Sequence, residues 1–191
     1  MITTKISSLY HFYPSTVTLV GAKKDGQVNF MAAAWNTCLS FDPPLFGVSI
    51  SPKRFTHHMI QETGEFTCSF LSMEHVEIIQ GTGTASGQDY EKVTAFNIPL
   101  EDSEIIKCPV IESAYAAYEC KLKYTYPVGD HDLFVGEVVA IHSQEGILSE
   151  KGILDAEKLN FAMYIGSDTY ISANPLTLKE VPREISIPPN K

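Results

Sequence analysis

The segment Ser51-Pro-Lys-Arg-Phe-Thr56 gathers side chains that could bind an anion. Two hydroxyls, Lys53 and Arg54 stand together at a point where the pattern predicts the start of a helix. Backbone N–H groups at a helix N-terminus are free to donate, and the helix dipole favours negative charge there. The segment therefore predicts a phosphate site. A second interpretation stays open, in which Ser51 and Thr56 cap the helix and the two basic side chains are merely solvated.

A second polar group follows an apolar stretch at Trp35-Asn-Thr-Cys38. An amide and a hydroxyl, together with backbone N–H donors, are what a flat heteroaromatic ring with carbonyl edges needs in order to be held in plane. Taken by itself, however, this stretch is better explained as a core tryptophan followed by ordinary polar turn residues.

Three other features carry weaker signals. Gly81-x-Gly83 lacks the third glycine of a dinucleotide-binding loop, because the next glycine stands at 87, so a plain flexible loop is expected there. His57 and His58 point to different faces of the expected helix, and no further ligands stand at metal spacing, so no metal site is predicted. No G-x-S-x-G or H-E-x-x-H motif supports a hydrolase.

Short apolar runs separated by Gly, Pro and Asp predict a mainly β, antiparallel fold with short helices. The most secure element is a hairpin with strands at 17–22 and 28–35, because Asp25-Gly26 supplies the positive φ angles of a tight turn. The other expected elements are a strand at 45–51 after Pro43-Pro44, a helix from Pro52 that ends at Gly64, a strand at 65–71, and a short helix from Ser72 that ends before the loop 81–87.

The clearest alternation lies at 118–126, where Glu119 and Lys121 share the side expected to face water. This strand should pair with 133–142 across a turn longer than two residues. From about 175 to 191 the prolines predict an extended tail that lies along another surface.

Composition limits the function classes. The chain has 191 residues, of which 44% are hydrophobic, and a net charge of −9. One domain spanning 1–191 is expected, and a nucleic-acid binder is disfavoured. The longest apolar run, Phe30–Trp35, is too short to span a bilayer, and the N-terminus lacks the apolar core of a secretory signal, so a cytoplasmic protein is expected. The four cysteines include no C-x-x-C pair and are expected to be free thiols.

Several segments together resemble the flavin reductase-like family. They are Val17–Gly21, Asn29–Trp35, Asp42–Leu45, Ser49–Thr56, Gly64–Phe66, Ser86-Gly87 with Lys92, and Gly129–Val138. The resemblance implies an FMN-binding split β-barrel of Greek-key, antiparallel type, which is normally a homodimer with a flavin near the subunit interface. Within the family, the chain is most similar to the flavoredoxins, FMN proteins of anaerobic electron-transfer chains.

The resemblance also implies roles for particular residues. The phosphate would be held by Ser51, Lys53, Arg54 and Thr56, and the isoalloxazine edge would be lined by Trp35, Asn36, Thr37 and Cys38. Lys92 would approach the ribityl or pyrimidine side of the flavin, Tyr164 would contribute from the C-terminal part, and His131 would lie near the nicotinamide site. Cys38 stands where other members carry Ser, Thr or another small residue, which leaves open which donor or acceptor meets the ring.

Three functions remain in view. The first is an FMN-binding oxidoreductase or electron carrier of the flavoredoxin type, with NAD(P)H or a redox protein as partner. The second is an NAD(P)H:flavin reductase that supplies reduced flavin to a partner enzyme. The third is a non-catalytic flavin-binding module.

Overall fold

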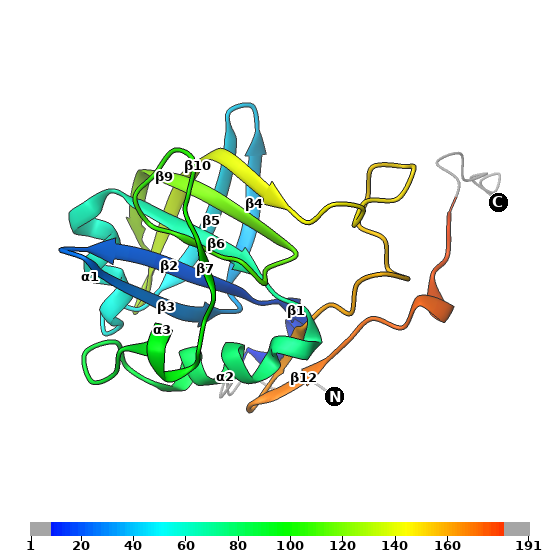
Figure 1. Cartoon of the computed structure of the whole chain (residues 1–191), viewed down its shortest axis with the longest axis horizontal. Coiled ribbons are helices and arrows are strands. Elements are labelled where there is room, and N and C mark those ends of the chain that lie inside the picture. Colours follow the sequence, from blue (N-terminus) through cyan, green and yellow to red (C-terminus); the bar gives the residue numbers. More distant parts are fainter. Residues whose placement is uncertain (1–8, 182–191) are drawn as a thin grey trace, which may run out of the picture.

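The computed structural model describes residues 9–181. Its body is a seven-stranded sheet in which every neighbouring pair is antiparallel (Figure 1). In spatial order the strands are β3 (Gln27–Ala33), β2 (Thr18–Lys24), β6 (Glu65–Phe70), β9 (Ala116–Pro127), β10 (Asp132–Ser143), β5 (Pro44–Ile50) and β4 (Asn36–Phe41). The two edge strands β3 and β4 are joined by only two residues, Ala34 and Trp35, so the sheet curls back on itself. The expected mainly β, barrel-like fold is confirmed.

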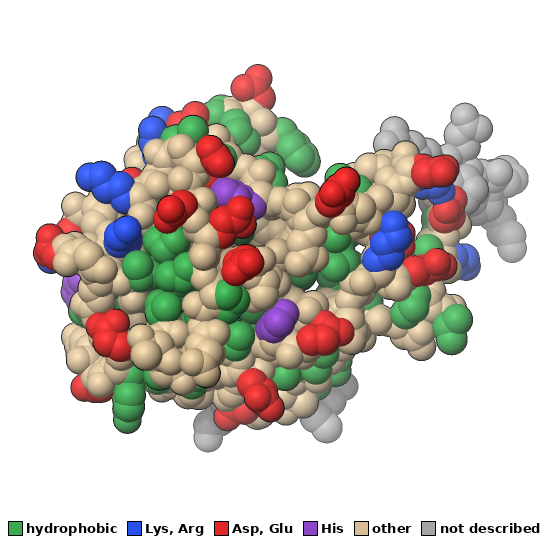
Figure 2. Space-filling model, in the orientation of Figure 1, with side chains coloured by type: hydrophobic (Ala, Val, Ile, Leu, Met, Phe, Trp, Pro, Cys, Tyr) green, Lys and Arg blue, Asp and Glu red, His purple; other side chains and the backbone are tan. Residues whose placement is uncertain are grey.

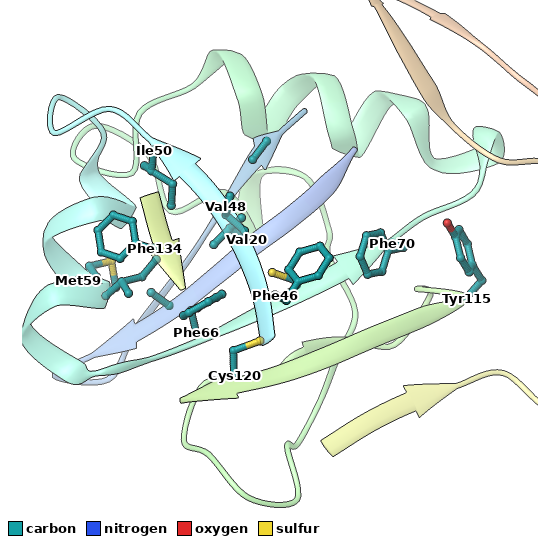
Figure 3. Packing of buried hydrophobic residues seen from close by; sticks show 14 of the residues in the cluster. Val20, Phe46, Val48, Ile50, Met59, Phe66, Phe70, Tyr115, Cys120 and Phe134 are labelled. Atoms are coloured by element: carbon teal, nitrogen blue, oxygen red, sulfur yellow. The ribbon is translucent and has the colours of Figure 1, made fainter. Parts of the chain in front are cut away.

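The inside of the barrel is an apolar core (Figure 3). Phe46, Phe66 and Phe134 come from three different strands and are each less than 5% exposed. Burying an aromatic side chain of this size contributes about 2–3 kcal/mol. The curled sheet therefore gives β5 and β10 a rigid base, and the segments that follow β5 and precede β10 carry the candidate site residues.

The hairpin of β2 and β3 forms as predicted. Asp25 and Gly26 occupy its turn with φ of 50° and 86°. The helix that follows β5 is α1 (Phe55–Thr63), which ends at Gly64 with φ of 70°, in the left-handed conformation that glycine adopts at little cost. The expected start at Pro52 was wrong: residues 52–54 form a turn in which the N–H of Arg54 donates to the carbonyl of Ser51 at 2.9 Å.

The strand β4 was missed by the sequence analysis, which extended the preceding strand to Trp35. The structure ends β3 at Ala33, and the chain then turns into β4, which pairs with β5. β4 is an edge strand, and most of its residues are exposed on both sides. It therefore lacks the alternation that marks a half-buried strand.

The long pair β9 and β10 confirms the predicted strands at 118–126 and 133–142. The expectation that Glu119 faces water was wrong, because this side chain is fully buried. Its carboxylate accepts hydrogen bonds from the backbone N–H groups of Glu104, Ile105 and Ile106 at 2.8–3.0 Å and contacts His142 Nε2 at 2.7 Å. The loop before β8 thus covers a strand face that local sequence assigns to solvent.

Two helices lie below the sheet in Figure 1: α2 (Val76–Thr84), preceded by the 3-10 turn η2 (Met73–His75), and α3 (Lys92–Ala95). The loop expected from Gly81 onward was wrong in its first part, because α2 continues to Thr84. Gly81 packs against Phe96, whose ring would stand 2.4 Å from a Cβ at that position. Only a residue without a side chain allows this approach.

The remaining elements are short. They are η1 (Tyr10–Phe12), β1 (Ser15–Thr16), β7 (Leu100–Glu101), β8 (Val110–Ile111), β11 (Met163–Gly166), β12 (Thr169–Ile171) and η3 (Pro175–Thr177). β1, β11 and β12 form a small sheet beside α2 (Figure 1). The segment 144–162 extends from one end of the barrel, and its Ile147 and Leu159 are buried against the barrel core. The expected tail falls partly on residues 182–191, outside the described residues. Between residues 9 and 181, no helix has the length and apolar character needed to cross a bilayer.

Candidate functional site

A small cavity lies between the start of α1, β3 and the segment after α2. It has a volume of about 130 Å³ and is called here the basic cavity. Its polar lining residues are Asn29, Lys53, Arg54, Thr56, Thr82, Thr84, Ser86 and Lys92. Acidic side chains are spread over the molecular face drawn in Figure 2, and the chain carries a net charge of −9. No carboxylate lines the basic cavity, so three cationic side chains give it a local positive character.

The N-terminus of α1 is open toward this cavity. Its N-cap residue is Arg54, and no side chain caps the helix. Ser51 Oγ reaches only the N–H of Lys53, at 3.5 Å, and the Thr56 hydroxyl is engaged elsewhere. The alternative in which Ser51 and Thr56 cap the helix is therefore wrong. The free N–H groups of the first helical turn can donate to an anion, as the segment predicts.

Asn29 is a lining residue that the sequence analysis did not single out. It is 2% exposed, and its Nδ2 lies 2.6 Å from Thr56 Oγ1, while its Oδ1 is buried without a hydrogen-bond partner in the described part of the chain. Leaving a buried amide oxygen without a hydrogen bond costs about 1–3 kcal/mol of stability, so a ligand that donates a hydrogen bond to this atom would be favoured. No local sequence pattern could have indicated it, because the fold brings Asn29 to Thr56 from 27 positions away.

Lys92 lies in the wall of the basic cavity and is 3% exposed. Its Nζ donates to the carbonyls of Phe30 at 2.9 Å and Thr82 at 2.7 Å. Burial, and to a lesser degree the positive charge of Arg54, lowers the pKa of Lys92 to about 8. At neutral pH the side chain keeps its charge beside Arg54. Its predicted approach to the ribityl or pyrimidine side of a flavin stays a prediction.

A second cavity, of about 160 Å³, adjoins the first and is called the aromatic cavity. Arg54, Met31 and Ala32 line both. The other lining residues of the aromatic cavity are Tyr13, Ala33, Ala34, Trp35, Ser49, Ile50, Ser51 and His131. The run of alanines in and after β3 leaves the space, because larger side chains there would fill it. One elongated ligand can therefore place an anionic end in the basic cavity and a flat end in the aromatic cavity.

His131 is brought to this site by the turn between β9 and β10. Its ring lies 4.8 Å from the ring of Trp35, measured between centroids, and its Nδ1 lies 2.8 Å from Asp130 Oδ1. Its backbone carbonyl accepts from the N–H of Val128 at 2.8 Å, which closes the turn. The structure thus brings Trp35 and His131 to Ser51 and Arg54, although the three segments are far apart in sequence.

Tyr164 lines a third cavity, of about 170 Å³, which shares Ala32 and Ala34 with the aromatic cavity. Tyr170 donates to Gln80 Oε1 at 2.8 Å, and Gln80 Nε2 donates to Asp168 Oδ1 at 2.9 Å. These bonds join α2 to the hairpin of β11 and β12. Tyr164 does not line the aromatic cavity. Its ring meets Tyr13, which does line that cavity, edge-on with centroids 5.3 Å apart.

Thr37 and Cys38 do not join this site. They line a separate apolar cavity of about 790 Å³, together with Phe46, Tyr118 and residues of the segment 144–162. Figure 2 shows the hollow between that segment and the barrel. Asn36 lines the same cavity, and its Nδ2 donates to the carbonyls of Thr16 and Ala33 at 3.0 and 2.9 Å. Trp35 lines the aromatic cavity, whereas the next three residues line the larger apolar cavity. Within one chain, the predicted ring-edge residues are therefore divided between two cavities.

Comparison with known proteins decides the family. The flavin reductase like domain matches residues 9–176. This chain belongs to the flavin reductase-like family. In that family, an FMN-binding protein from Thermus thermophilus, crystallised with 1-cyclohex-2-enone, has 39% sequence identity and a TM-score of 0.84 over 94% of this chain and 98% of that protein. The matched fold is the FMN-binding split barrel, as the resemblance implied.

Two further relatives differ in their named roles. A flavoredoxin from Methanosarcina acetivorans has 27% identity and a TM-score of 0.81 over 91% of this chain and 92% of its own. An NADH-dependent flavin reductase from a Rhodococcus species is 30% identical over 68% of this chain and 69% of its own. The proteins similar to this chain therefore include one named a flavoredoxin and one named an NADH-dependent flavin reductase.

Proposed function

We propose that this chain is an FMN-binding oxidoreductase or electron carrier of the flavoredoxin type. The observation that carries the proposal is the continuity of the basic cavity with the aromatic cavity through Arg54. FMN has the same two parts, an anionic phosphate and a flat tricyclic ring. The similar Thermus thermophilus protein is described as FMN-binding, which supports the same ligand here.

The residues present fit FMN. Lys53, Arg54 and the open N-terminus of α1 offer donors and positive charge for the phosphate. The unpaired Oδ1 of Asn29 offers an acceptor, which suits a hydroxyl of the ribityl chain. Gly87 packs close to that same oxygen, because a Cβ there would stand 2.2 Å from it, so a side chain at position 87 would displace Asn29. Bound FMN supplies two-electron chemistry, and these residues bind and orient it.

The second candidate is an NAD(P)H:flavin reductase in which flavin is a dissociable substrate. It is favoured by the similar Rhodococcus enzyme and by His131, which stands at the open side of the aromatic cavity with 24% of its side chain exposed. The third candidate, a flavin-binding module without turnover, uses the same cavities.

An absorption spectrum of the purified protein, followed by anaerobic titration with NADH and then NADPH, separates the three. A carrier of the flavoredoxin type shows flavin bands as purified and is reduced and reoxidised by a redox partner or by NAD(P)H. A colourless protein that reduces added FMN with saturation kinetics is a flavin reductase. Bound flavin that no donor reduces indicates the module. Failure to bind any flavin overturns all three.

We also propose that the protein is a homodimer. The segment 172–181 carries Leu176, Leu178 and Val181 with 92%, 67% and 63% of their surface exposed. The apolar cavity that holds Cys38 adjoins the segment 144–162. A second subunit would cover such apolar surface. Sedimentation equilibrium should give a mass of about twice 21.1 kDa, and a monomer over a wide concentration range would contradict the proposal.

A further inference from the structure

The loop 102–109, between β7 and β8, is held on the sheet by two side-chain carboxylates. Figure 1 shows the chain around β7 crossing the sheet. The backbone N–H groups of residues 104–106 donate to the Glu119 carboxylate at 2.8–3.0 Å, and that of Lys107 donates to Glu65 Oε1 at 2.8 Å. Between residues 9 and 181, no backbone-to-backbone hydrogen bond joins residues 102–107 to the sheet. The attachment of this loop therefore depends on acidic side chains.

Glu119 is the stronger of the two attachment points. Each of its carboxylate oxygens has two hydrogen-bond partners, because Oε1 also lies 2.7 Å from His142 Nε2 on β10. Burial raises the pKa of Glu119, but the hydrogen bonds from His142 and from the three backbone N–H groups lower it by more, so the pKa lies below its usual range. The side chain is a carboxylate at neutral pH, and its charge strengthens each bond that it accepts.

The loop also buries a thiol. Cys108 is fully buried, and its Sγ lies 3.7 Å from Thr67 Oγ1 on β6, which donates to the carbonyl of Pro109 at 3.3 Å. Cys68 and Cys120 are buried as well, but they belong to the core inside the barrel. Cys108 is thus shielded by the loop that carries it, whereas the other two thiols are shielded by the barrel.

Opening of this loop would be a local event. Its two ends are joined by the pairing of β7 with β8, in which Leu100 lies opposite Ile111. The Ser103 hydroxyl donates to the carbonyl of Cys108 at 2.5 Å, so the loop is also closed on itself. A short segment that is closed at its base and attached by few hydrogen bonds can open while the rest of the domain stays folded.

We propose that Glu119 is the pH-sensitive anchor of a local switch: its carboxylate holds the loop 102–109 on the sheet, and its protonation lets the loop open and exposes Cys108. A protonated carboxyl group has lost its charge, and its O–H is a donor that meets N–H donors. Because the pKa of Glu119 is lowered in the closed form, the stabilisation is complete above the usual range of a glutamate and is lost as the pH falls through the lowered pKa. This switch requires no flavin.

Other ionisable groups stand near the anchor. They are His142 on β10, Lys121 on β9, Glu65 on β6, Lys23 on β2, and Glu104, Lys107 and Cys108 in the loop. Protonation of Glu65 would weaken only the bond from Lys107, whereas protonation of Glu119 would weaken three bonds from the loop. Variants of the two glutamates therefore separate their contributions.

Labelling of the purified protein with dithiodipyridine measures the opening, with each cysteine quantified by peptide mass spectrometry. Rates are divided by the rate for glutathione at the same pH. In Glu119→Gln at pH 7.5, labelling of Cys108 should be about tenfold faster than in wild-type protein, because the bonds lose their charged acceptor. In wild-type protein a similar rise is expected at about pH 3.5, one unit below the ordinary pKa of a glutamate, and Glu119→Gln should lack this acid response.

The other cysteines and a second glutamate provide controls. Exposed Cys38 should react rapidly throughout, and the core thiols Cys68 and Cys120 should stay protected while Cys108 reacts. Glu137→Gln also removes a carboxylate from the sheet, one that pairs with Lys123, and should leave Cys108 labelling unchanged.

Unchanged labelling of Cys108 in Glu119→Gln would overturn the inference. Equal labelling of the three buried cysteines would overturn it too, because it would show that the whole domain unfolds. An acid response that persists in Glu119→Gln and disappears in Glu65→Gln would make Glu65 the anchor instead. Flavin titration is a separate measurement, so none of these results decides the proposed function.

Discussion

His57 Nε2 lies 2.7 Å from Asp132 Oδ2, and this bond joins the first turn of α1 to the first residue of β10. His57 is 2% exposed, and its Nδ1 is buried with no hydrogen-bond partner in the described part of the chain. Arg54 precedes α1 and His131 precedes β10. The bond therefore fixes the position of Arg54, which lines both cavities, relative to His131, which lines the aromatic cavity.

Removing the charge from this pair should loosen both cavities. Asp132→Asn is expected to lower the free energy of unfolding by about 1–3 kcal/mol and to weaken FMN binding, because a buried imidazole loses a charged acceptor. Urea denaturation and flavin titration measure the two effects. The control is Asp102→Asn, an exposed aspartate after β7 that lines neither cavity. Equal stability of both variants would show that the pair has no such role.

Arg54 is expected to contribute to FMN binding through the phosphate. Arg54→Ala should weaken FMN binding by about 1.5–3 kcal/mol, the range for a hydrogen bond to a charged group, and leave riboflavin binding nearly unaltered. Fluorescence titration with both flavins measures the difference. Lys23→Ala, near the end of β2, is the control for loss of positive charge. Equal losses for FMN and riboflavin would contradict the phosphate assignment.

Gly87 should tolerate no side chain. A Cβ at this position would stand 2.2 Å from Asn29 Oδ1 and 2.6 Å from Phe55 Cδ1. Gly87→Ala is therefore expected to weaken FMN binding about tenfold through the strain of overpacking. At Gly83, which lines the same cavity, the nearest atom would be Ala32 Cβ at 3.2 Å, so Gly83→Ala should have a smaller effect. The reverse order of the two variants would argue against the basic cavity as the site.

The charge of Lys92 should make FMN binding depend on pH. Its pKa is lowered to about 8, so the side chain is cationic below that pH and loses its charge as the pH rises through it. The affinity for FMN relative to riboflavin should therefore be highest below pH 8 and fall above it by about 1 kcal/mol, on the order of fivefold. A bound phosphate dianion will move this transition to higher pH by linkage.

Titrations of both flavins between pH 6.5 and 10 check this expectation, with about 1.4 kcal/mol per tenfold change in affinity. Lys92→Met is the matched variant and should show weaker FMN binding with no transition in the FMN-to-riboflavin ratio. A transition of the same size in Lys92→Met would assign the pH dependence to another group.

Local sequence patterns were enough to predict the elements whose conformation is set by residues that are neighbours in the chain. Asp25-Gly26 determines a tight hairpin through its positive φ angles, and Gly64 ends α1 for the same reason. The alternation at 118–126 determined the longest strand pair. The hydroxyls and cations of the segment 51–56 lie next to one another in the chain and in the structure line the two adjoining cavities, while their binding of a phosphate stays a prediction.

The walls of the site were decided by the tertiary structure. Asn29 and Gly87 meet the segment 51–56, and Tyr13 lines a cavity with it, only because the sheet curls and α2 packs against β3. No short-range pattern records such an arrangement. Glu119 was assigned to solvent because alternation reports only one strand, whereas a distant loop covers it. Trp35 and Cys38 line different cavities because β4, which carries Cys38, is an edge strand whose direction is set by its pairing with β5.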